Sequence, residues 1–589
     1  MTRLHLRLVA VAAILLLAAA PAIISPFSVS LLNFIGVYAL AALGLVLLTG
    51  IGGMLSFGQA AFVGIAGYAT AWATVDEGLS PWIGLLLALA LTGAVAAVLG
   101  AVTLRLKGHF LSLSTIAWGL AIFFLFGNIP GLGQFTGIEG VPPIPIFGFV
   151  LGSDRRVFYL IWAVVIGALC LSANLLASRE GRAMRALRGG QVLTESLGID
   201  PFRVRLVTFI LAALLSALSG WLFAHMSRLV SPSPFDVTHG ILYLLMAMVG
   251  GMGHLSGAVV GAAIVTLLRN YIQDWLPLIA PGASSQLEIV VFAVLFILLL
   301  QRARAGLVPY LLRYLPRATP APPPPAAPLD RRRQPLPGAP VLAVAEVSRR
   351  FGGLLAVNNV SFDLQAGEIL GLIGPNGAGK TTMFNLISGA LRPDAGRVTF
   401  CGTEVTRFPT RRIARLGVAR TFQHVKLRAD MSLRDNVLLG TYSRTRAGFL
   451  AGALRLGRGE EAQAEGEAMR QLSRVGLDRR AHDLAGNLSL GEQRLLEIAR
   501  ALAADPVLLL LDEPAAGLRA KEKAELATLL RALKGEGLTI LLVEHDMDFV
   551  MGLVDRSVVM DFGSKLCEGS PAEVRRDPRV QEAYLGGVV

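Results

Sequence analysis

Cysteine is scarce in this chain. Its 589 residues include only three cysteines, Cys170, Cys401 and Cys567, which lie far apart and form neither a pair nor a metal-ligand spacing. The sequence therefore argues against a disulfide framework, and the second half of the chain suits a reducing compartment.

Charged side chains are nearly absent from the N-terminal region. From Leu8 to Leu104 the only ones are Asp76 and Glu77, whereas from Val341 onward charges recur every few residues. The whole chain is 54% hydrophobic and 16% charged, with a mean hydropathy of +0.60. A chain of this length and unevenness is not a single domain. It predicts an all-α polytopic membrane domain followed by a soluble domain.

Acidic residues are too few to balance the basic ones, and the formal net charge is +13. Residues 1–340 hold 21 Lys and Arg against 11 Asp and Glu, a balance of +10, and the remainder carries +3. The excess clusters in loops and in the segment that joins the two halves. Positive loops that stay in the cytoplasm explain this pattern better than nucleic-acid binding does, so no nucleic acid is expected as a partner.

Apolar segments long enough to cross ~30 Å of hydrocarbon follow one another along the first half. They lie near residues 8–25, 30–49, 54–74, 81–104, 109–128, 157–177, 206–227 and 286–300. Residues 240–268 are also apolar, but the glycine-rich stretch GGMGHLSG interrupts them. A signal peptide is the alternative for the first segment, and its length favours a first span.

Parity constrains the number of spans. Arg3 and Arg7 place the N-terminus inside, and the loop 178–205, with six arginines, is also expected inside. The region 240–268 must then cross an even number of times. We predict ten spans, with 240–268 forming two short spans hinged at the glycines; eight spans plus a re-entrant pair is the second choice.

Residues 316–340 contain ten prolines, a composition that predicts an extended, poorly packed spacer. The predicted organisation is therefore a membrane domain over 1–305, a Pro/Arg-rich linker over 306–340, and a soluble domain over 341–589.

The segment LIGPNGAGKTT fits the pattern G-x-x-x-x-G-K-[ST] directly after an apolar strand. Its glycines allow backbone N–H groups to surround phosphates, Lys380 reaches the β- and γ-phosphate oxygens, and Thr381 ligates Mg²⁺. The residues predicted to bind the nucleotide here are Gly374, Asn376, Gly377, Gly379, Lys380, Thr381 and Thr382.

A second apolar run, VLLLLDEP, suits a strand buried on both faces of a parallel sheet and ends in two carboxylates. Asp512 is placed to hold Mg²⁺, and Glu513 to orient or deprotonate the attacking water. A further strand, TILLVEHD, presents His545 at its end as a γ-phosphate contact. ATP and Mg²⁺ are the expected cofactors.

The segment LSLGEQRLLEIARAL predicts a helix that begins near Ser489 and Gly491. A serine and bare backbone at a helix N-terminus form an anion site, so the chain has two phosphate-binding surfaces.

With these motifs in order, the second half resembles the ATP-binding cassette of ABC transporters, an α/β P-loop NTPase. LSLGEQ is similar to the ABC signature, and the resemblance implies that Gln423 in ARTFQ senses Mg²⁺ and the membrane domain and that Phe351 in RRFGG stacks on adenine. RFGGLLAVNNVSF, DEPAAGL and EAYLG resemble the ATP-binding subunit of branched-chain amino acid importers. Glu492, Leu490 and Arg519 depart from the usual pattern.

The first half resembles the permease of the same importers over roughly residues 30–300. The pieces that carry the resemblance are LTGIGGMLSFGQAAFVGIAGYA, GRAMRALRGGQVLTESLGI and GGMGHLSGAVVGA. The chain therefore resembles a fusion of permease and ATPase, in which ATP hydrolysis drives a solute across the bacterial cytoplasmic membrane with the ATPase domain in the cytoplasm.

Several alternatives stay open. An ABC exporter, and a carrier that the cassette only regulates, compete with an importer. The resemblance implies leucine, isoleucine or valine as the solute, but urea, amides and small aromatic acids are served by similar permeases. The implied partners are a second permease, a second ATP-binding subunit and an extracytoplasmic solute-binding protein, with a homodimer as the alternative.

The basic loop 178–205 carries a further hypothesis. Its segment Gln191–Ile199 is predicted to form a short helix between Gly190 and Pro201 and to dock on the cassette near Gln423.

Overall fold

The computed structural model describes residues 15–106, 110–279, 285–314 and 326–585. The chain divides into two compact units. The first comprises Met1–Leu176 and Phe202–Ala321, and the second comprises Ala177–Pro201 and Pro322–Val589. A short piece of the membrane half, residues 177–201, thus belongs with the nucleotide-binding half.

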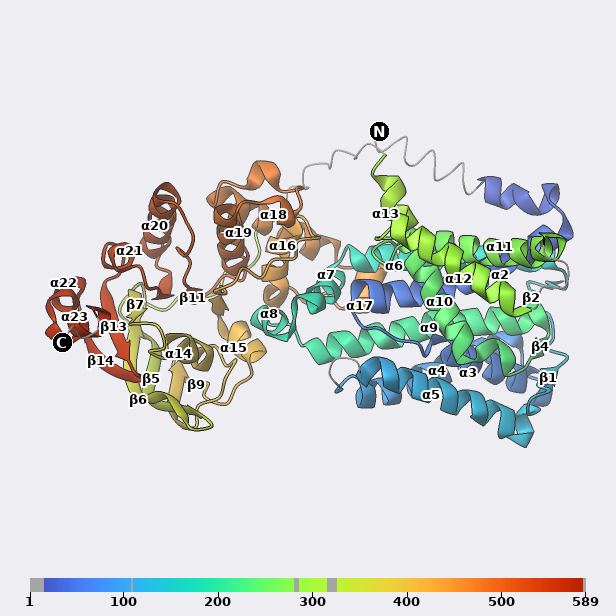
Figure 1. The fold of residues 1–589 in the computed structure, drawn as a ribbon, viewed down its shortest axis with the longest axis horizontal. Coiled ribbons are helices and arrows are strands. Elements are labelled where there is room, and N and C mark those ends of the chain that lie inside the picture. Colours follow the sequence, from blue (N-terminus) through green and yellow to red (C-terminus); the bar gives the residue numbers. More distant parts are fainter. Residues whose placement is uncertain (1–14, 107–109, 280–284, 315–325, 586–589) are drawn as a thin grey trace. The chain divides into compact units, whose positions relative to one another are not determined.

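The first unit is helical. Its helices are α2 (Pro26–Leu45, continued by the π-helical η1, Val46–Ile51), α3 (Gln59–Ala71, continued by η2, Trp72–Asp76), α4 (Pro81–Thr103), α5 (Phe110–Asn128), α6 (Asp154–Leu176), α9 (Pro201–Ser227), α10 (Val237–Gly250), α11 (Leu255–Ile279), α12 (Ser285–Arg302) and α13 (Leu307–Leu312). Two small antiparallel pairs, β1 (Ile138–Glu139) with β4 (Leu229–Val230) and β2 (Pro145–Ile146) with β3 (Phe149–Val150), lie in the connections. Figure 1 labels the α-helices of this unit and the strands β1, β2 and β4.

Six of the described helices are long and apolar enough to cross a membrane: Pro26–Ile51, Pro81–Thr103, Phe110–Asn128, Asp154–Leu176, Pro201–Ser227 and Leu255–Trp275. Two shorter apolar helices span Val237–Gly250 and Val290–Leu299. The predicted segment 54–74 is α3 followed by a π-helical turn. Much of the predicted first span, and Arg3 and Arg7 before it, lies outside the described residues. The number of ten spans stays a prediction.

The glycine stretch near residue 250 separates two helices, as the sequence predicts. Helix α10 ends at Gly250, and Gly251 has φ +115°, a conformation that glycine adopts readily and other residues do not. A Cβ on Gly261 of α11 would lie 1.7 Å from the Met246 carbonyl oxygen of α10, so bare backbone lets the two helices pack closely. The 14 residues of α10 measure roughly 21 Å, which is short for a full span.

Small and polar residues hold the helices of this unit together. A Cβ on Gly220 of α9 would lie 2.1 Å from the Val63 carbonyl oxygen of α3. Buried serines on the same helix donate across the interfaces: Ser219 to the Val37 carbonyl at 2.8 Å and Ser216 to Gln59 Oε1 at 2.7 Å. Close backbone approach and interhelical hydrogen bonds are the usual means of helix association in lipid.

The second unit contains two sheets and their covering helices. Its elements are α7 (Arg179–Ala186), α8 (Gln191–Ser196), β5 (Pro340–Phe351), β6 (Leu354–Gln365), β7 (Ile369–Ile373), α14 (Lys380–Ile387), β8 (Ala395–Phe400), β9 (Thr403–Glu404), α15 (Thr410–Leu416), β10 (Val418–Arg420), α16 (Leu433–Gly440), η6 (Thr441–Arg444), α17 (Phe449–Ala453), α18 (Arg458–Arg474), α19 (Leu490–Leu502), β11 (Leu508–Asp512), α20 (Ala520–Gly535), β12 (Thr539–Val543), α21 (Met547–Met551), β13 (Arg556–Asp561), β14 (Ser564–Gly569), α22 (Pro571–Arg576) and α23 (Pro578–Leu585).

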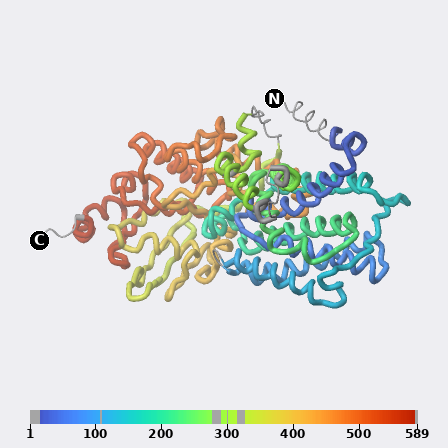
Figure 2. Tube along the Cα trace, turned by 45° about the vertical axis from the view of Figure 1, so that its right-hand side comes forward, coloured from blue at the N-terminus to red at the C-terminus, as the bar shows by residue number. Residues whose placement is uncertain are grey.

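The larger sheet has the strand order β10-β11-β12-β7-β13-β14, in which every neighbouring pair except β13–β14 is parallel. The smaller sheet is antiparallel, with the order β6-β5-β8-β9. Strands β7, β11 and β12 are fully buried runs of aliphatic residues, as expected for central strands of a parallel sheet covered on both faces. Helices α16, α18 and α19 share an apolar cluster of their own. Figure 2 traces the chain from a second direction.

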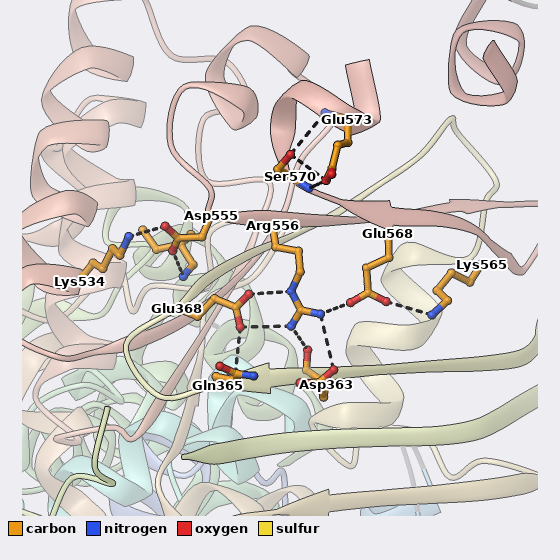
Figure 3. Close-up of polar contacts among 11 residues, drawn as sticks. Asp363, Gln365, Glu368, Lys534, Asp555, Arg556, Lys565, Glu568, Ser570 and Glu573 are labelled. Carbon is orange, nitrogen blue, oxygen red and sulfur yellow. Dashed lines mark hydrogen bonds and ion pairs between the residues drawn. The ribbon is translucent and has the colours of Figure 1, made fainter. Parts of the chain in front are cut away.

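A charged network fixes the strand that leads into the phosphate loop. Arg556, the first residue of β13, pairs with Glu368 before β7 at 2.9 Å and also with Asp363 and Glu568 (Figure 3). The neighbouring carboxylate of Asp555 accepts from the Ile369 N–H at 2.9 Å and pairs with Lys534. These contacts hold the start of β7 in register with β13.

The later part of the Pro-rich linker packs on the cassette, unlike the poorly packed spacer that its composition predicts. Leu329 is 6% exposed and joins the apolar cluster of α16, α18 and α19. The Arg444 guanidinium donates to the carbonyls of Leu329 and Asp330 at 3.3 and 3.0 Å. Arg332 donates its backbone N–H to Asp505 and its side chain to the Arg415 carbonyl. Residues 329–332 thus form a strap across the cassette.

Shortening the buried side chain of this strap should destabilise the cassette. We expect Leu329→Ala to lower the free energy of unfolding by about 2–3 kcal/mol, because it leaves a cavity in the cluster. Leu336→Ala is the matched control, since Leu336 belongs to the same linker and is 80% exposed; its effect should stay within about 0.5 kcal/mol. Thermal unfolding of the purified protein measures both, and equal effects would show that the strap contributes no packing.

Candidate functional site

The register of the parallel sheet places the predicted site residues at one edge. Asp512 at the end of β11 pairs with Val543 at the end of β12, and Val543 pairs with Leu372 near the end of β7. The chain therefore leaves all three strands at the same level. Asp512 and Glu513 stand at the end of β11, Glu544 and His545 follow β12, and the glycine loop follows β7.

The glycine loop is shaped by close backbone contacts. Gly374 has φ +152°, and a Cβ there would lie 2.1 Å from the Met560 carbonyl oxygen of β13. Gly379 ends the loop, and α14 begins directly at Lys380. The Lys380 ammonium donates to the carbonyls of Gly374 and Pro375 at 2.7 and 2.9 Å, within a side chain that is 7% exposed. Burial lowers its pKa, and the charges of Glu513 and Asp512 oppose that shift.

The other predicted loop residues lie where phosphates can reach them. Asn376 and Gly377 are exposed at the tip of the loop, Thr381 is exposed and Thr382 half-buried in the first turn of α14. The free N–H groups of this helix N-terminus and the lysine make an anion site on physical grounds alone.

Asp512 is a buried carboxylate, and one of its two oxygens is not used in a hydrogen bond among the described residues. It is 2% exposed, and its Oδ1 has no hydrogen-bond partner in the described part of the chain. Burial raises the pKa of Asp512 to about 6, against the opposing charge of Arg420. A buried carboxylate oxygen beside the phosphate loop suits a divalent cation, and Asp512 with the Thr381 hydroxyl forms a donor set that fits Mg²⁺.

Glu513 and His545 face each other at the ends of adjacent strands. Glu513 adopts φ +46°, and its Oε2 lies 3.7 Å from His545 Nδ1. Between them, Glu544 is fully buried and accepts from the Ala515 N–H at 2.7 Å and from the His545 N–H at 3.1 Å. Glu544 was not predicted from the sequence; the signal that could have found it was a carboxylate at the end of the buried strand TILLV.

Gln423 and Phe351 lie on the flanks. Gln423 is exposed three residues beyond β10, the neighbour of β11, and its carbonyl accepts from Arg494 at 2.6 Å. Phe351 is 42% exposed at the end of β5, in the hairpin whose Ala356 carbonyl touches Gly379. Arg349 lies 5.0 Å from the Phe351 ring.

The helix predicted after LSLGEQ begins as expected. Ser489 is the N-cap of α19 and accepts from the Glu492 N–H, while the Glu492 carboxylate accepts from the Ser489 N–H at 2.9 Å. This capping box, completed by Arg480 at 2.5 Å from Glu492, gives a physical reason for the glutamate that departs from the usual pattern. Gly491 is buried against Glu522. No hydrogen bond or ion pair joins the first turn of α19 to the phosphate loop among the described residues.

The predicted docking helix exists and lies on the cassette. Helix α8 packs on α15: Arg415 donates to the Gly198 carbonyl at 2.9 Å, and Arg411 pairs with Asp200 at 3.4 Å. The contact therefore lies mainly on α15, which precedes β10, rather than on Gln423 itself. Thr194 is fully buried, with its hydroxyl bonded inside the loop at Gly190.

Helix α7 of the same loop, which the sequence analysis missed, makes a more extensive contact with the cassette than α8 does. The Arg179 guanidinium lies 3.6 Å from the Tyr442 ring centroid and donates to the Tyr442 carbonyl. Arg182 pairs with Glu461 at 2.8 Å, and Glu461 also accepts from the Arg179 N–H. Glu180 is 2% exposed beside the Tyr442 hydroxyl. The six arginines of the loop were the available signal, but the docking hypothesis drawn from this basic loop placed the contact in Gln191–Ile199 and not in the segment that contains Arg179 and Arg182.

Removing the buried charge of Asp512 should stabilise the protein. A carboxyl whose pKa rises on folding destabilises the native state above that pKa, and the cost disappears below the unfolded value of about 4. A rise from 3.8 to about 6 corresponds to roughly 3 kcal/mol at pH 7.5. We expect Asp512→Asn to raise the melting temperature of nucleotide-free protein at pH 7.5 and to leave it unchanged near pH 4. A lower melting temperature at pH 7.5 would contradict this.

Comparison with known proteins finds a matching family for each half of the chain. Residues 27–300 match the family described as "Branched-chain amino acid transport system / permease component", residues 357–516 match "ABC transporter", and residues 564–589 match "Branched-chain amino acid ATP-binding cassette transporter". The described part of the permease match contains α2 through α11 and most of α12.

Curated relatives match the second half over almost their whole length. The high-affinity branched-chain amino acid transport ATP-binding protein LivG of Salmonella typhimurium is 47% identical over 250 residues, which is 42% of this chain and 98% of LivG. BraF of Pseudomonas aeruginosa is 43% identical with the same coverage. A solved nucleotide-free ATP-binding cassette of an ABC transporter is 30% identical, with a TM-score of 0.38, over 42% of this chain and 100% of that one. Given the identity to LivG and the two cassette matches behind a permease match, this chain belongs to the branched-chain amino acid family of ABC transporters, with permease and ATP-hydrolysing cassette fused in one polypeptide.

Proposed function

We propose that this chain imports leucine, isoleucine, valine or a similar hydrophobic amino acid across a bacterial cytoplasmic membrane, using ATP hydrolysed by its own second half. The observation that carries the proposal is the packing of residues 177–201, which connect two apolar helices, into the cassette unit. Arg179 and Arg182 on Glu461 and Tyr442 make a contact through which nucleotide-driven movement of the cassette reaches the permease. The names of the relatives support the choice of solute over urea, amides or aromatic acids.

The positions of the site residues support a separate role for each of them in ATP hydrolysis. Lys380 and the backbone N–H groups of residues 376–382 would hold the β- and γ-phosphates. Thr381, Asp512 and Gln423 would hold Mg²⁺, which when bound neutralises charge on the β- and γ-phosphate oxygens. Glu513 would accept a proton from the attacking water or orient it, and His545, half-exposed beside it, would contact the γ-phosphate.

The arrangement of the second phosphate-binding surface supports a pair of cassettes. Ser489 caps its own helix and shares no hydrogen bond with the phosphate loop in the described residues, so its anion site would serve a nucleotide held by another cassette. The partners would be a second permease, a second ATP-binding subunit and an extracytoplasmic solute-binding protein, with a homodimer of fused chains as the alternative. The cassette would lie in the cytoplasm, with lipid around the apolar helices.

Substitutions of Glu513 and of Lys380 should affect different steps, the first ATP hydrolysis and the second ATP binding. We expect Glu513→Gln to bind ATP with near-normal affinity and to lose at least about a hundredfold in turnover, because the group facing the water is gone. Lys380→Ala should weaken ATP binding itself. Equilibrium binding of ATP and phosphate release by the purified complex distinguish the two variants. Near-normal turnover in Glu513→Gln would remove Glu513 from its role.

Reversing the charge of Glu461 should uncouple the two halves. Glu461→Lys places a cation against Arg179 and Arg182, which are well buried, and should break the docking contact. We expect basal ATP hydrolysis to persist and its stimulation by the solute-loaded binding protein to fall at least about tenfold, corresponding to about 1.4 kcal/mol or more. Glu525→Lys on the exposed face of α20 is the matched control. Stimulation that survives in Glu461→Lys would show that coupling takes another route.

A further inference from the structure

The segment that follows α12 is basic and contains no acidic residue. Arg302, Arg304 and Arg313 are all exposed. No Asp or Glu occurs between Ile289 and Leu329, so the segment itself supplies no carboxylate that could neutralise them. Arg304 and Arg313 form no ion pair with a carboxylate in the described part of the chain. The end of α12 and the helix α13 therefore carry an excess of accessible positive charge.

Helix α13 is held in place on the break between α10 and α11. A Cβ on Gly306, just before α13, would lie 2.3 Å from the Gly251 Cα in the break. A Cβ on Gly251 would in turn lie 2.6 Å from Pro309 Cδ of α13. Val308 is only 8% exposed. One side of α13 is thus packed against the permease unit, and its opposite side has a fixed direction.

The outer side of α13 is apolar although it is open. Leu311, Leu312 and Tyr314 are 51%, 43% and 74% exposed, and Arg313 lies among them. Aliphatic side chains, a tyrosine and arginines on one short helix are typical of an element that lies in the interface of a membrane. The side chains of this outer side suit a surface that is apolar at one level and negatively charged at the next.

The length of α10 indicates the level of this helix. The Asp236 side chain, which caps the start of α10, is 34% exposed. An open carboxylate is not kept in hydrocarbon, so α10 starts at or outside the boundary of the hydrocarbon core. Its 14 residues measure roughly 21 Å, about 9 Å less than the ~30 Å thickness of the core. The break at Gly251, with α13 packed on it, therefore does not extend beyond the opposite boundary.

We propose that α13 and the end of α12 form a binding site for an anionic phospholipid of the cytoplasmic leaflet. Arg304 and Arg313 bind its phosphate, because arginine stems lie along apolar surface and bring the guanidinium to the headgroups. The acyl chains lie against Leu311, Leu312 and Tyr314. The site rests on the proposed function, since that proposal places the permease in a membrane and the cassette in the cytoplasm. Net positive charge favours an anionic lipid over a zwitterionic one.

A nitroxide on the outer side of α13 tests what covers it. Leu312→Cys, in a chain whose three native cysteines are replaced by serine, is spin-labelled and reconstituted with its copurifying subunits in vesicles of phosphatidylcholine and phosphatidylglycerol. We expect collisions with oxygen, which concentrates in lipid, to exceed those with the water-soluble nickel chelate Ni-EDDA at least about threefold. Leu354→Cys on the cassette, 67% exposed, is the matched control and should show the reverse order.

The charge of the two arginines gives the second arm. A fluorophore on Leu312→Cys is quenched by nitroxide-labelled phosphatidylglycerol or phosphatidylcholine at equal mole fraction. We expect phosphatidylglycerol to quench at least about twofold more strongly. The double variant Arg304→Gln/Arg313→Gln should lose this preference. Arg155→Gln/Arg156→Gln, which removes two exposed arginines at the start of α6, should keep it.

The other occupants of this surface give different results. Low collision rates with both reagents would show that protein, such as a partner permease, covers α13, and the lipid site would be wrong. Frequent collisions with Ni-EDDA would show that α13 faces water, with the same consequence. Inorganic phosphate that removes the preference, beyond the effect of chloride at equal ionic strength, would show that the arginines bind free phosphate and not lipid.

Leucine uptake in the same vesicles separates the lipid site from the proposed function. If the wild-type complex imports leucine but α13 faces water or protein, the lipid site is wrong and the import function stands. If it imports no leucine but both arms give the expected results, the solute is wrong and the lipid site stands. If the chain does not float with the vesicles, the membrane location fails and the lipid site with it.

Discussion

The hydrogen-bonded register of three parallel strands is the constraint on which the nucleotide site depends. Asp512, Val543 and Leu372 lie in one row, so the acidic pair, the histidine and the phosphate loop, which are separated by up to 170 residues of chain, emerge at one edge. A shift of one residue would reverse the facing of every side chain on a strand. The charged network around Arg556 and Asp555, with the packing of Met560 against Gly374, keeps β7 in that register.

The same edge carries an electrostatic cost that the chain retains. Asp512 is buried with an unsatisfied oxygen, and Lys380 is buried with its charge turned to loop carbonyls. Neither arrangement is favourable in a protein at rest, since burial disfavours both charged forms. Both would become favourable if phosphates and a cation bound at this edge. Asp512 and Lys380 are therefore already desolvated before a ligand binds, so binding would not have to remove water from these two groups.

The coupling that we propose between the two halves rests on a different kind of contact. Residues 177–201 belong by chain order to the permease and by packing to the cassette, where buried arginines meet Glu461 and Tyr442. Arg415 links this loop to the strap of the linker, because its side chain binds Gly198 and its carbonyl binds Arg332. In a fused chain the linker is therefore part of the docking surface rather than only a tether, and it supports the α15 face on which α8 lies.

Local pattern determined much of this protein in advance. Runs of apolar residues predicted the helices near 81–104, 109–128 and 206–227, the glycine stretch at 250–257 predicted a break, and motif spacing predicted the phosphate loop and the acidic strand end. Such features are properties of contiguous residues, so the sequence contains them whole. Tertiary structure alone decided the rest. The packing of Leu329 and Arg332, the burial of Glu544, the Arg179–Tyr442 contact and the packing of Gly306 on Gly251 all join segments distant in sequence. Composition describes a proline-rich strap and an arginine-rich loop as solvated, because the surfaces that receive them are formed only when the chain folds.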